Sequence, residues 1–128
     1  MAVSKDSKQI RVLFSPYFDT EYAALVEQIK KEKAEKIVNS QNMQLLKAID
    51  RVINVLKVDP DYGIHISKNL MPKQLIQDYQ INNLWKINLP NGWRLLYTLS
   101  TNRLEIIALL LDFLDHKKYD KLFGYKKK

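Results

Sequence analysis

The feature that most constrains the fold is the stretch of residues 84–97, LWKINLPNGWRLLY, which has the pattern of a β-hairpin. Pro90 favours the first corner of a type I turn, Asn91 suits the second corner, and Gly92 can take the left-handed conformation that closes a three-residue loop. The resulting register gives one apolar face, made of Trp85, Ile87, Leu89, Trp93, Leu95 and Tyr97. The other face receives Lys86, Asn88, Arg94 and Leu96. A two-residue Asn-Gly turn would mix the two sets, so the longer loop is favoured.

The composition indicates a single folded domain, residues 1–128. The chain has 128 residues, 46% of them hydrophobic, and no cysteine, which excludes disulfides, a thiolate nucleophile and a cysteine-type zinc site. The histidines, His65 and His116, are not spaced as a metal-binding pair, so we expect no metal and no cofactor. The first residues lack the apolar core of a signal peptide, and the longest apolar run, residues 106–111, is too short to cross a bilayer. We therefore expect a cytoplasmic protein that does not enter membranes.

The charge of the chain favours an anionic partner. The formal net charge is +7, and the last fifteen residues, 114–128, hold six lysines but only two acidic residues. Such a bias is typical of nucleic-acid-binding proteins, although a lysine-rich surface can also serve solubility alone.

Short strand and capping signals predict the first half of the chain. Residues 10–14, IRVLF, are rich in β-forming side chains and predict a first strand. Ser15 followed by Pro16 is typical of a helix start, and a break at Ser40 begins a second helix. Apolar residues at helical spacing predict the buried stripes of the two helices. They are Phe18, Tyr22, Leu25, Val26 and Ile29 in the first, and Met43, Leu46, Ile49, Ile53 and Leu56 in the second.

The second half of the chain adds two short helices and a long strand. A short helix is predicted to open at Pro72 and end at Tyr79. Residues 104–114, LEIIALLLDFL, are apolar on both alternating faces at their centre, as in a central strand. Asp115 can cap a last helix over residues 116–123, which Gly124 would end.

These elements predict an α+β fold in the order β-α-α-β-β-β-α. The sheet is expected to be small and antiparallel, with the N-terminal helical hairpin packed on one face. Residues 1–8 are expected to be flexible, and residues 124–128 form a basic tail.

Three residues are candidates for chemistry. His116 and Tyr119 are spaced i, i+3 in the predicted last helix, and histidine can serve as a general acid or base near neutral pH. Arg94 stands on a rigid strand beside Lys86, and its guanidinium can grip two phosphate oxygens. The structural alternatives are a helix-start histidine, a packed tyrosine and an ordinary solvated arginine.

Two segments of the chain resemble the RelE/ParE superfamily of type II toxin–antitoxin systems. They are NNLWKINLPNGWRLLYTL, residues 82–99, and LLLDFLDHKKYDKLFGYKKK, residues 109–128. The hairpin pattern W-K/R…G-x-R-L-x-Y and the H-x-x-Y-D segment, which is similar to that of HigB-type members, carry the resemblance. It covers about residues 10–125 and includes the predicted order of elements.

The resemblance implies a RelE-like mRNA interferase, a metal-independent endoribonuclease that cuts messenger RNA on the ribosome and inhibits translation. The 2′-hydroxyl of the substrate would attack the adjacent phosphate. Arg94 would stabilise the phosphorane, His116 would act as acid or base, and Tyr119 would orient the nucleotide or assist proton transfer. The residues implied to contact RNA are Lys68, Lys86, Lys118 and Lys121. A glutamate base, which some members have before the hairpin, is not evident here.

The resemblance also implies a small cognate antitoxin as partner, with a toxin–antitoxin hetero-oligomer or a homodimer as the assembly. Two alternatives stay open: a ParE-like toxin that inhibits gyrase without nuclease activity, and an inactive basic nucleic-acid-binding protein with the same fold. The catalytic hypothesis sets a geometric condition. Arg94 must lie on the sheet face away from the helical hairpin, and it must lie near His116.

Overall fold

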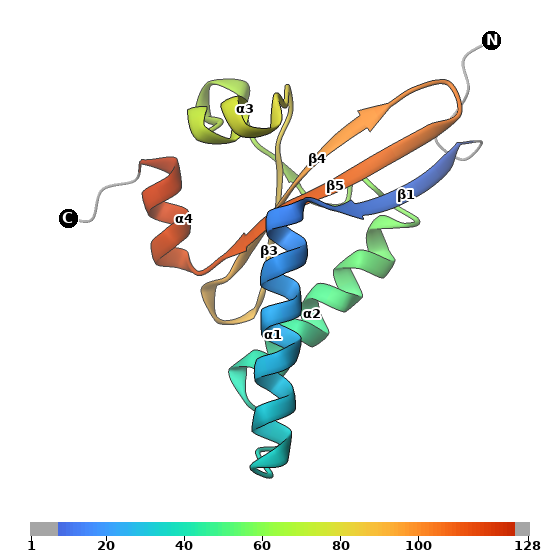
Figure 1. Ribbon diagram of the computed structural model, residues 1–128. Helices are drawn as coiled ribbons and strands as arrows, with labels where there is room; N and C mark the ends of the chain where they lie inside the picture. Colours follow the sequence, from blue (N-terminus) through green and yellow to red (C-terminus); the bar gives the residue numbers. More distant parts are fainter. Residues whose placement is uncertain (1–7, 125–128) are drawn as a thin grey trace.

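The computed structural model describes residues 8–124 and contains one five-stranded sheet with helices on both faces (Figure 1). The strands are β1 (Gln9–Phe14), β2 (Ile64–His65), β3 (Trp85–Asn88), β4 (Arg94–Thr101) and β5 (Glu105–Leu114). The α-helices are α1 (Pro16–Ala34), α2 (Gln41–Leu56), α3 (Lys73–Tyr79) and α4 (His116–Phe123), and two 3-10 turns are η2 (Lys68–Leu70) and η3 (Pro90–Gly92). The predicted α+β class is confirmed. Residues 1–7 and 125–128, to which most of the predicted flexible start and basic tail belong, lie outside the described residues.

The sheet is mixed, so the prediction of an antiparallel sheet is wrong for one pair of strands. The strand order is β1-β5-β4-β3-β2, and β1 runs parallel to β5 while the other pairs are antiparallel. Strands joined by a tight turn must be antiparallel, whereas β1 and β5 are separated by most of the chain and are free to pair in either direction. The alternation of side chains in IRVLF does not encode that direction.

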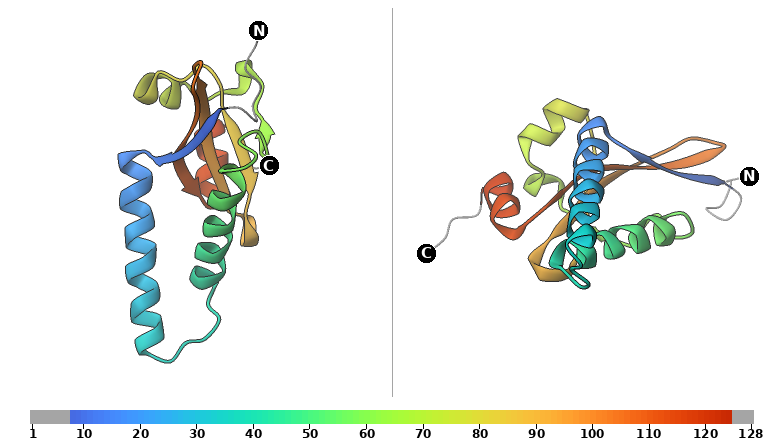
Figure 2. Two further views of the ribbon diagram at one scale, coloured as in Figure 1. Left: turned by 90° about the vertical axis from the view of Figure 1, so that its right-hand side faces the viewer. Right: turned by 60° about the horizontal axis from the view of Figure 1, so that its bottom comes forward.

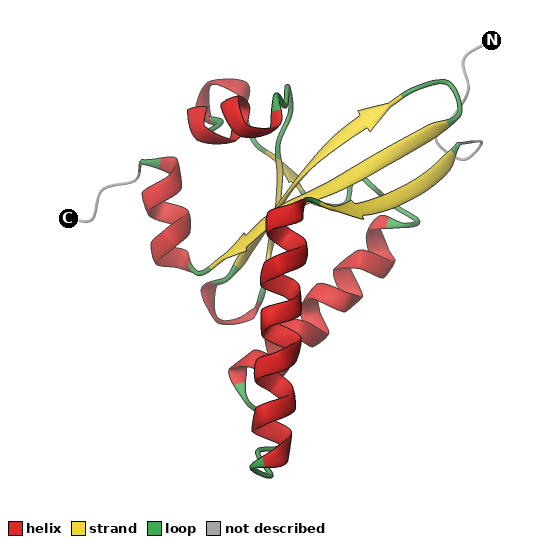
Figure 3. Ribbon diagram, in the orientation of Figure 1, coloured by secondary structure: helices red, strands yellow, loops and turns green. Residues whose placement is uncertain are grey.

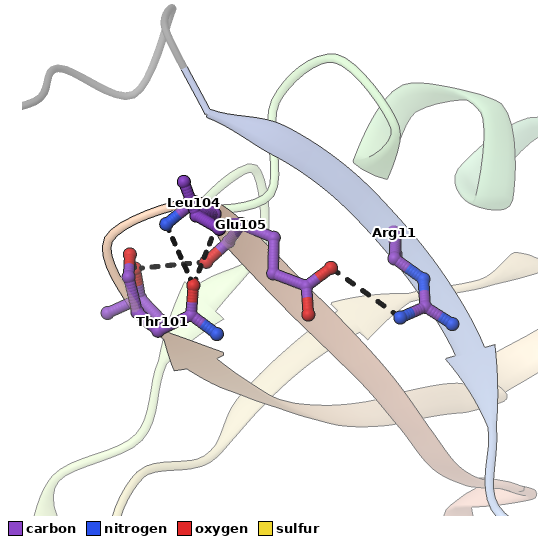
Figure 4. Close-up of polar contacts among 5 residues, drawn as sticks. Arg11, Thr101, Leu104 and Glu105 are labelled. Atoms are coloured by element: carbon purple, nitrogen blue, oxygen red, sulfur yellow. Dashed lines mark hydrogen bonds and ion pairs between the residues drawn. The ribbon is translucent and has the colours of Figure 1, made fainter.

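Polar contacts link β1 and β5 at the end where both strands begin (Figure 4). The side chain of Arg11 in β1 forms an ion pair with Glu105 in β5, with 3.5 Å between Nη1 and Oε2. The Asn102 side-chain oxygen accepts hydrogen bonds from the backbone N–H groups of Leu104 and Glu105, which shapes the turn between β4 and β5. The exposed ion pair contributes little stability, so the backbone ladder sets the register.

The predicted hairpin is confirmed in register but not in turn type. Trp85 pairs with Tyr97 and Ile87 with Leu95, and the Leu89 N–H donates to the Trp93 carbonyl at 2.8 Å. In the loop, Asn91 has φ 61° and Gly92 has φ 80°. The second corner of a type I turn has a negative φ, so the predicted geometry fails at Asn91. Asparagine tolerates the left-handed region, and its side chain here donates to Gln44 of α2.

The helical hairpin begins as predicted and covers one face of the sheet (Figure 2). The Ser15 side chain accepts from the Phe18 N–H at 3.0 Å, and Pro16 is the first helical residue. Ser40 caps α2 in the same way through the Met43 N–H. The fully buried residues of α2 are Leu45, Ile49, Val52 and Leu56. The predicted stripe is confirmed at Ile49 and Leu56, whereas Met43, Leu46 and Ile53 are only partly buried and pack against this core.

A second, smaller core lies on the opposite face, beneath α3 and α4. It is formed by Ile66, Met71, Leu75, Leu84, Leu96, Leu111, Leu114 and Tyr119. The start of α3 after Pro72 and its end at Tyr79 match the prediction. The two-residue strand β2 was missed, since its exposed Ile64 and His65 carry no alternation to detect. Helix α4 has the predicted bounds, with Asp115 accepting from the Lys118 N–H and Gly124 in the left-handed conformation.

These helices gather around the sheet rather than alternate with each strand (Figure 3). Within residues 8–124, no helix combines the length and apolar character needed to cross a bilayer.

Candidate functional site

Arg94 is the first residue of β4, and its side chain lies on the face of the sheet away from the helical hairpin. Its neighbour Leu95 belongs to the core beneath α1 and α2, and side chains alternate along a strand, so Arg94 points to the side of α4. Nη1 of the guanidinium donates to the carbonyls of Gly92, at 2.8 Å, and Trp93, at 3.2 Å. Nε is buried and has no hydrogen-bond partner. The hairpin loop thus fixes one end of the guanidinium and leaves a second donor unsatisfied.

Tyr119 of α4 lies between the two cations of the hairpin face. The Arg94 Cζ and the Lys86 Nζ are each 5.5 Å from the centroid of the Tyr119 ring. The ring is 5% exposed and stacks on Phe123, with 4.3 Å between centroids. Its electron-rich face attracts both positive charges and lets them lie close together. The structure therefore brings together three predicted residues: Arg94, Lys86 and Tyr119.

His116 is the first residue of α4 and lies against the hairpin loop that also contacts Arg94. It is exposed, and its backbone position is fixed by the Asp115 cap. A Cβ atom placed on Gly92 would lie 3.3 Å from His116 Nδ1, so the imidazole packs directly against the hairpin loop. Gly92 thus touches His116 on one side and accepts a hydrogen bond from Arg94 on the other. The first part of the geometric condition, the face of the sheet, is met, and Gly92 is a neighbour that Arg94 and His116 share.

The remaining predicted lysines divide into two sets. Lys118 and Lys121 line a cavity on the flank of α4. Lys68 begins η2 and is exposed, and its carbonyl accepts from the Met71 N–H, but its side chain takes part in none of the hydrogen bonds or ion pairs seen in the described part of the chain. The structure therefore does not join Lys68 to the group around Tyr119.

The cavity beside α4 has a volume of about 410 Å³ and contains a carboxylate. It is lined by Gln74, Asp112, Leu114, Lys118, Lys121 and Leu122. Asp112 pairs across the strands with Leu96, which in turn pairs with Lys86, so all three project from the same sheet face. The cavity and the Tyr119 group are neighbours on that face.

Asp112 has the most perturbed carboxyl group among the described residues. Burial raises its pKa to about 7, and the negative charge of Glu21 adds to the rise, while the Phe113 N–H and the Lys118 ammonium oppose it. Its Oδ1 atom is buried without a hydrogen-bond partner. Tyr17 of α1 faces the same region: its hydrogen bond to Glu21 and the charge of Asp112 raise the pKa of Tyr17 to about 12.

The motifs of the sequence did not single out Asp112. The sequence nevertheless contains a signal. Asp112 is a lone charged residue inside the apolar run of β5, at a position that a fully buried strand would fill with an apolar side chain.

Comparisons with known proteins give no neighbour: the chain matches no protein-family model, no curated protein and no solved structure. The resemblance to the RelE/ParE superfamily stays a prediction.

Proposed function

We propose that this chain is a RelE-like endoribonuclease, the toxin of a type II toxin–antitoxin system, and that it cuts messenger RNA on the ribosome. One observation carries the proposal. Arg94 and Lys86 both lie over the ring of Tyr119, and Arg94 and His116 both contact Gly92 of the hairpin loop, although these side chains come from β3, β4 and α4. A strand-borne guanidinium beside an exposed imidazole is a suitable pair for phosphoryl transfer.

The proposed reaction is the one that the resemblance implies. The 2′-hydroxyl gives up its proton and attacks the adjacent phosphorus, and the bond to the 5′-oxygen breaks, leaving a 2′,3′-cyclic phosphate and a 5′-hydroxyl end. His116 either accepts the proton of the 2′-hydroxyl or donates a proton to the leaving 5′-oxygen, and water exchanges the proton at the other oxygen. Arg94 and Lys86 stabilise the added negative charge. Tyr119 holds the two cations together.

The proposed partners are RNA and a cognate antitoxin. Messenger and ribosomal RNA supply the anions that a chain of net charge +7 would attract. A cognate antitoxin in the cytoplasm would silence the toxin most simply by covering the face that carries Arg94 and α4.

In vitro translation tests the proposal, with messenger cleavage mapped at single-nucleotide resolution. The unaltered chain should cut the message, and Arg94→Ala and His116→Ala should each reduce the cleavage rate by about 100-fold or more. Arg103→Ala and His65→Ala are matched controls, because both side chains are exposed and come from other elements: Arg103 from the turn between β4 and β5, and His65 from β2. An intact message with the unaltered chain would overturn the nuclease proposal.

A non-cleaving binder is the second candidate, and the contacts of Arg94 favour it. Nη1 is occupied by two carbonyls, and Tyr119 is almost fully buried, as expected for a structural cluster. Such a protein would bind RNA with a steep salt dependence and leave it uncut, or inhibit gyrase supercoiling as ParE-like toxins do. Measuring supercoiling and RNA binding on the same preparation separates these outcomes.

A further inference from the structure

We propose that Gln44 of α2 is a positioning residue for the proposed nuclease site, which it reaches through Asn91 of the hairpin loop. The inference rests on the proposed function where it concerns cleavage. The Asn91 side-chain nitrogen donates to Gln44 Oε1 at 3.3 Å, and the two residues are 47 positions apart in the chain. Within residues 8–124, this is the only hydrogen bond that joins loop residues 90–92 to an element outside the hairpin.

The hairpin loop has a conformation that a neighbouring side chain can select. Asn91 and Gly92 both have a positive φ, 61° and 80°. The Trp93 N–H donates to the Pro90 carbonyl at 3.4 Å, which closes a turn with the φ signs of type I′. The same residues also suit a type I turn, in which Asn91 would have a negative φ. The hydrogen bond to Gln44 stabilises the left-handed conformation of Asn91 against that alternative.

Gly92 follows Asn91 in the loop and contacts both proposed catalytic residues. Its carbonyl accepts from Arg94 Nη1 at 2.8 Å. Its Cα lies so close to the imidazole that an added Cβ would be 3.3 Å from His116 Nδ1. A change in the sign of φ at Asn91 would move Gly92. Both the carbonyl that holds the guanidinium and the surface on which the imidazole packs would then be displaced.

The backbone of Gln44 is fixed by the start of α2. Ser40 caps this helix through the Met43 N–H, and the Gln44 N–H donates to the Ser40 carbonyl at 3.1 Å. The Ser40 hydroxyl and the Asn42 amide both donate to the carboxylate of Glu32 in α1, a residue that is 8% exposed. The two helices therefore hold Gln44 in place, while its side chain reaches the loop from the opposite side to α4.

Single-turnover cleavage of ribosome-bound messenger RNA, at saturating concentrations of the full chain, tests the role in the reaction. Gln44→Met keeps the length of the side chain but removes the acceptor, and the rate should fall by about three- to tenfold. Gln44→Glu keeps an acceptor oxygen for the Asn91 amide and should retain most of the rate. Gln41→Met makes the same change at an exposed glutamine in the same turn of α2, and this matched control should keep the full rate.

NMR spectroscopy tests the position of the loop without relying on cleavage. The unaltered chain should give a nuclear Overhauser contact between the Gly92 Hα protons and the His116 side chain, which meet in the structure. The contact should be lost in Gln44→Met and kept in both Gln44→Glu and Gln41→Met.

Asn91→Asp tests whether the effect travels through Asn91. Aspartate also tolerates the left-handed region, but it sets an acceptor against Gln44 Oε1, so this variant should show the same losses as Gln44→Met. Because both changes break one contact, the double variant should cleave no more slowly than the slower single variant. Losses that multiply in the double variant would overturn the proposed route.

The outcomes keep the positioning role and the nuclease apart. If the unaltered chain leaves the message intact, the nuclease is overturned, and the NMR contact alone decides whether Gln44 holds the loop. If the chain cuts the message and Gln44→Met keeps either the full rate or the NMR contact, the positioning role is overturned while the nuclease stands. Equal losses in Gln41→Met would show a general disturbance of α2 and would also overturn the role.

Discussion

The guanidinium of Arg94 lies over the ring of Tyr119, with 5.5 Å between Cζ and the ring centroid. Lys86 approaches the same ring at the same distance, so one aromatic side chain holds two cations that would repel each other without it. This contact also joins α4 to the hairpin and thereby places His116 against Gly92. The position of the imidazole and the position of the guanidinium are therefore coupled through α4.

Truncation of Tyr119 should cost stability, while removal of its hydroxyl alone should cost far less. Tyr119→Ala deletes a ring that is 5% exposed and stacked on Phe123, and we expect the free energy of unfolding to fall by about 3 kcal/mol. Tyr119→Phe keeps the ring and its attraction for the cations. Urea denaturation measures both variants. Equal losses would show that the hydroxyl, not the ring, holds α4 in place.

Substitution of Gly92 should disturb His116 without removing any functional group. Gly92→Ala strains a residue with φ +80°, and the new Cβ would meet Nδ1 of His116 at 3.3 Å. We expect a loss of about 1–2 kcal/mol in stability and a clear drop in messenger cleavage, caused by displacement of the ring. Gly124→Ala is the matched control: its φ is +75° and its Cβ meets nothing within 4 Å, so stability should fall similarly while cleavage persists. Loss of cleavage in both variants would point to global unfolding.

The sequence predicted the parts of the fold that depend on local chemistry. The caps at Ser15, Ser40 and Asp115 and the register of the hairpin each follow from a few neighbouring residues, and each is confirmed. The direction of β1 depends on pairing with a strand about ninety residues away, and nothing in its own side chains specifies it.

The same distinction applies to the candidate site. Arg94, Lys86 and Tyr119 could be grouped from the hairpin register and the last helix, and the structure places them together. The apolar run of β5 marks Asp112 as unusual, but the groups that surround it come from α1, α3 and α4, and their proximity depends on the tertiary fold. Lys68 entered the predicted set through the resemblance alone, and the structure places it in η2 without joining it to the group around Tyr119.

Removal of the Asp112 charge should change how stability depends on pH. Burial raises the pKa of this carboxyl to about 7 in the folded chain, above the value of about 4 expected after unfolding. The folded state therefore holds the proton more tightly, and its stability falls as the pH rises from about 4 to about 7. The free energy of unfolding of Asp112→Asn should therefore rise relative to that of the unaltered chain by roughly 2 kcal/mol between pH 4 and pH 7. This value allows for solvent screening of a partly exposed side chain.

Urea denaturation at pH 4, 6 and 8 measures this gain. Asp19→Asn serves as the control for the loss of one negative charge. A difference between Asp112→Asn and the unaltered chain that stays constant from pH 4 to pH 8 would contradict a raised pKa.

Arg94 and Lys121 should affect RNA in different ways. Arg94→Lys keeps the charge but loses the fork that bonds the carbonyls of Gly92 and Trp93, so the cleavage rate should fall by about 100-fold while RNA affinity changes little. Lys121→Ala removes an exposed ammonium outside the Tyr119 group and should weaken RNA binding, reducing the slope of log affinity against log salt by about 1. Single-turnover cleavage at saturating protein and binding at several salt concentrations measure the two effects. If Arg94→Lys instead weakened binding and left the saturated rate unchanged, Arg94 would be a binding residue that takes no part in the chemical step.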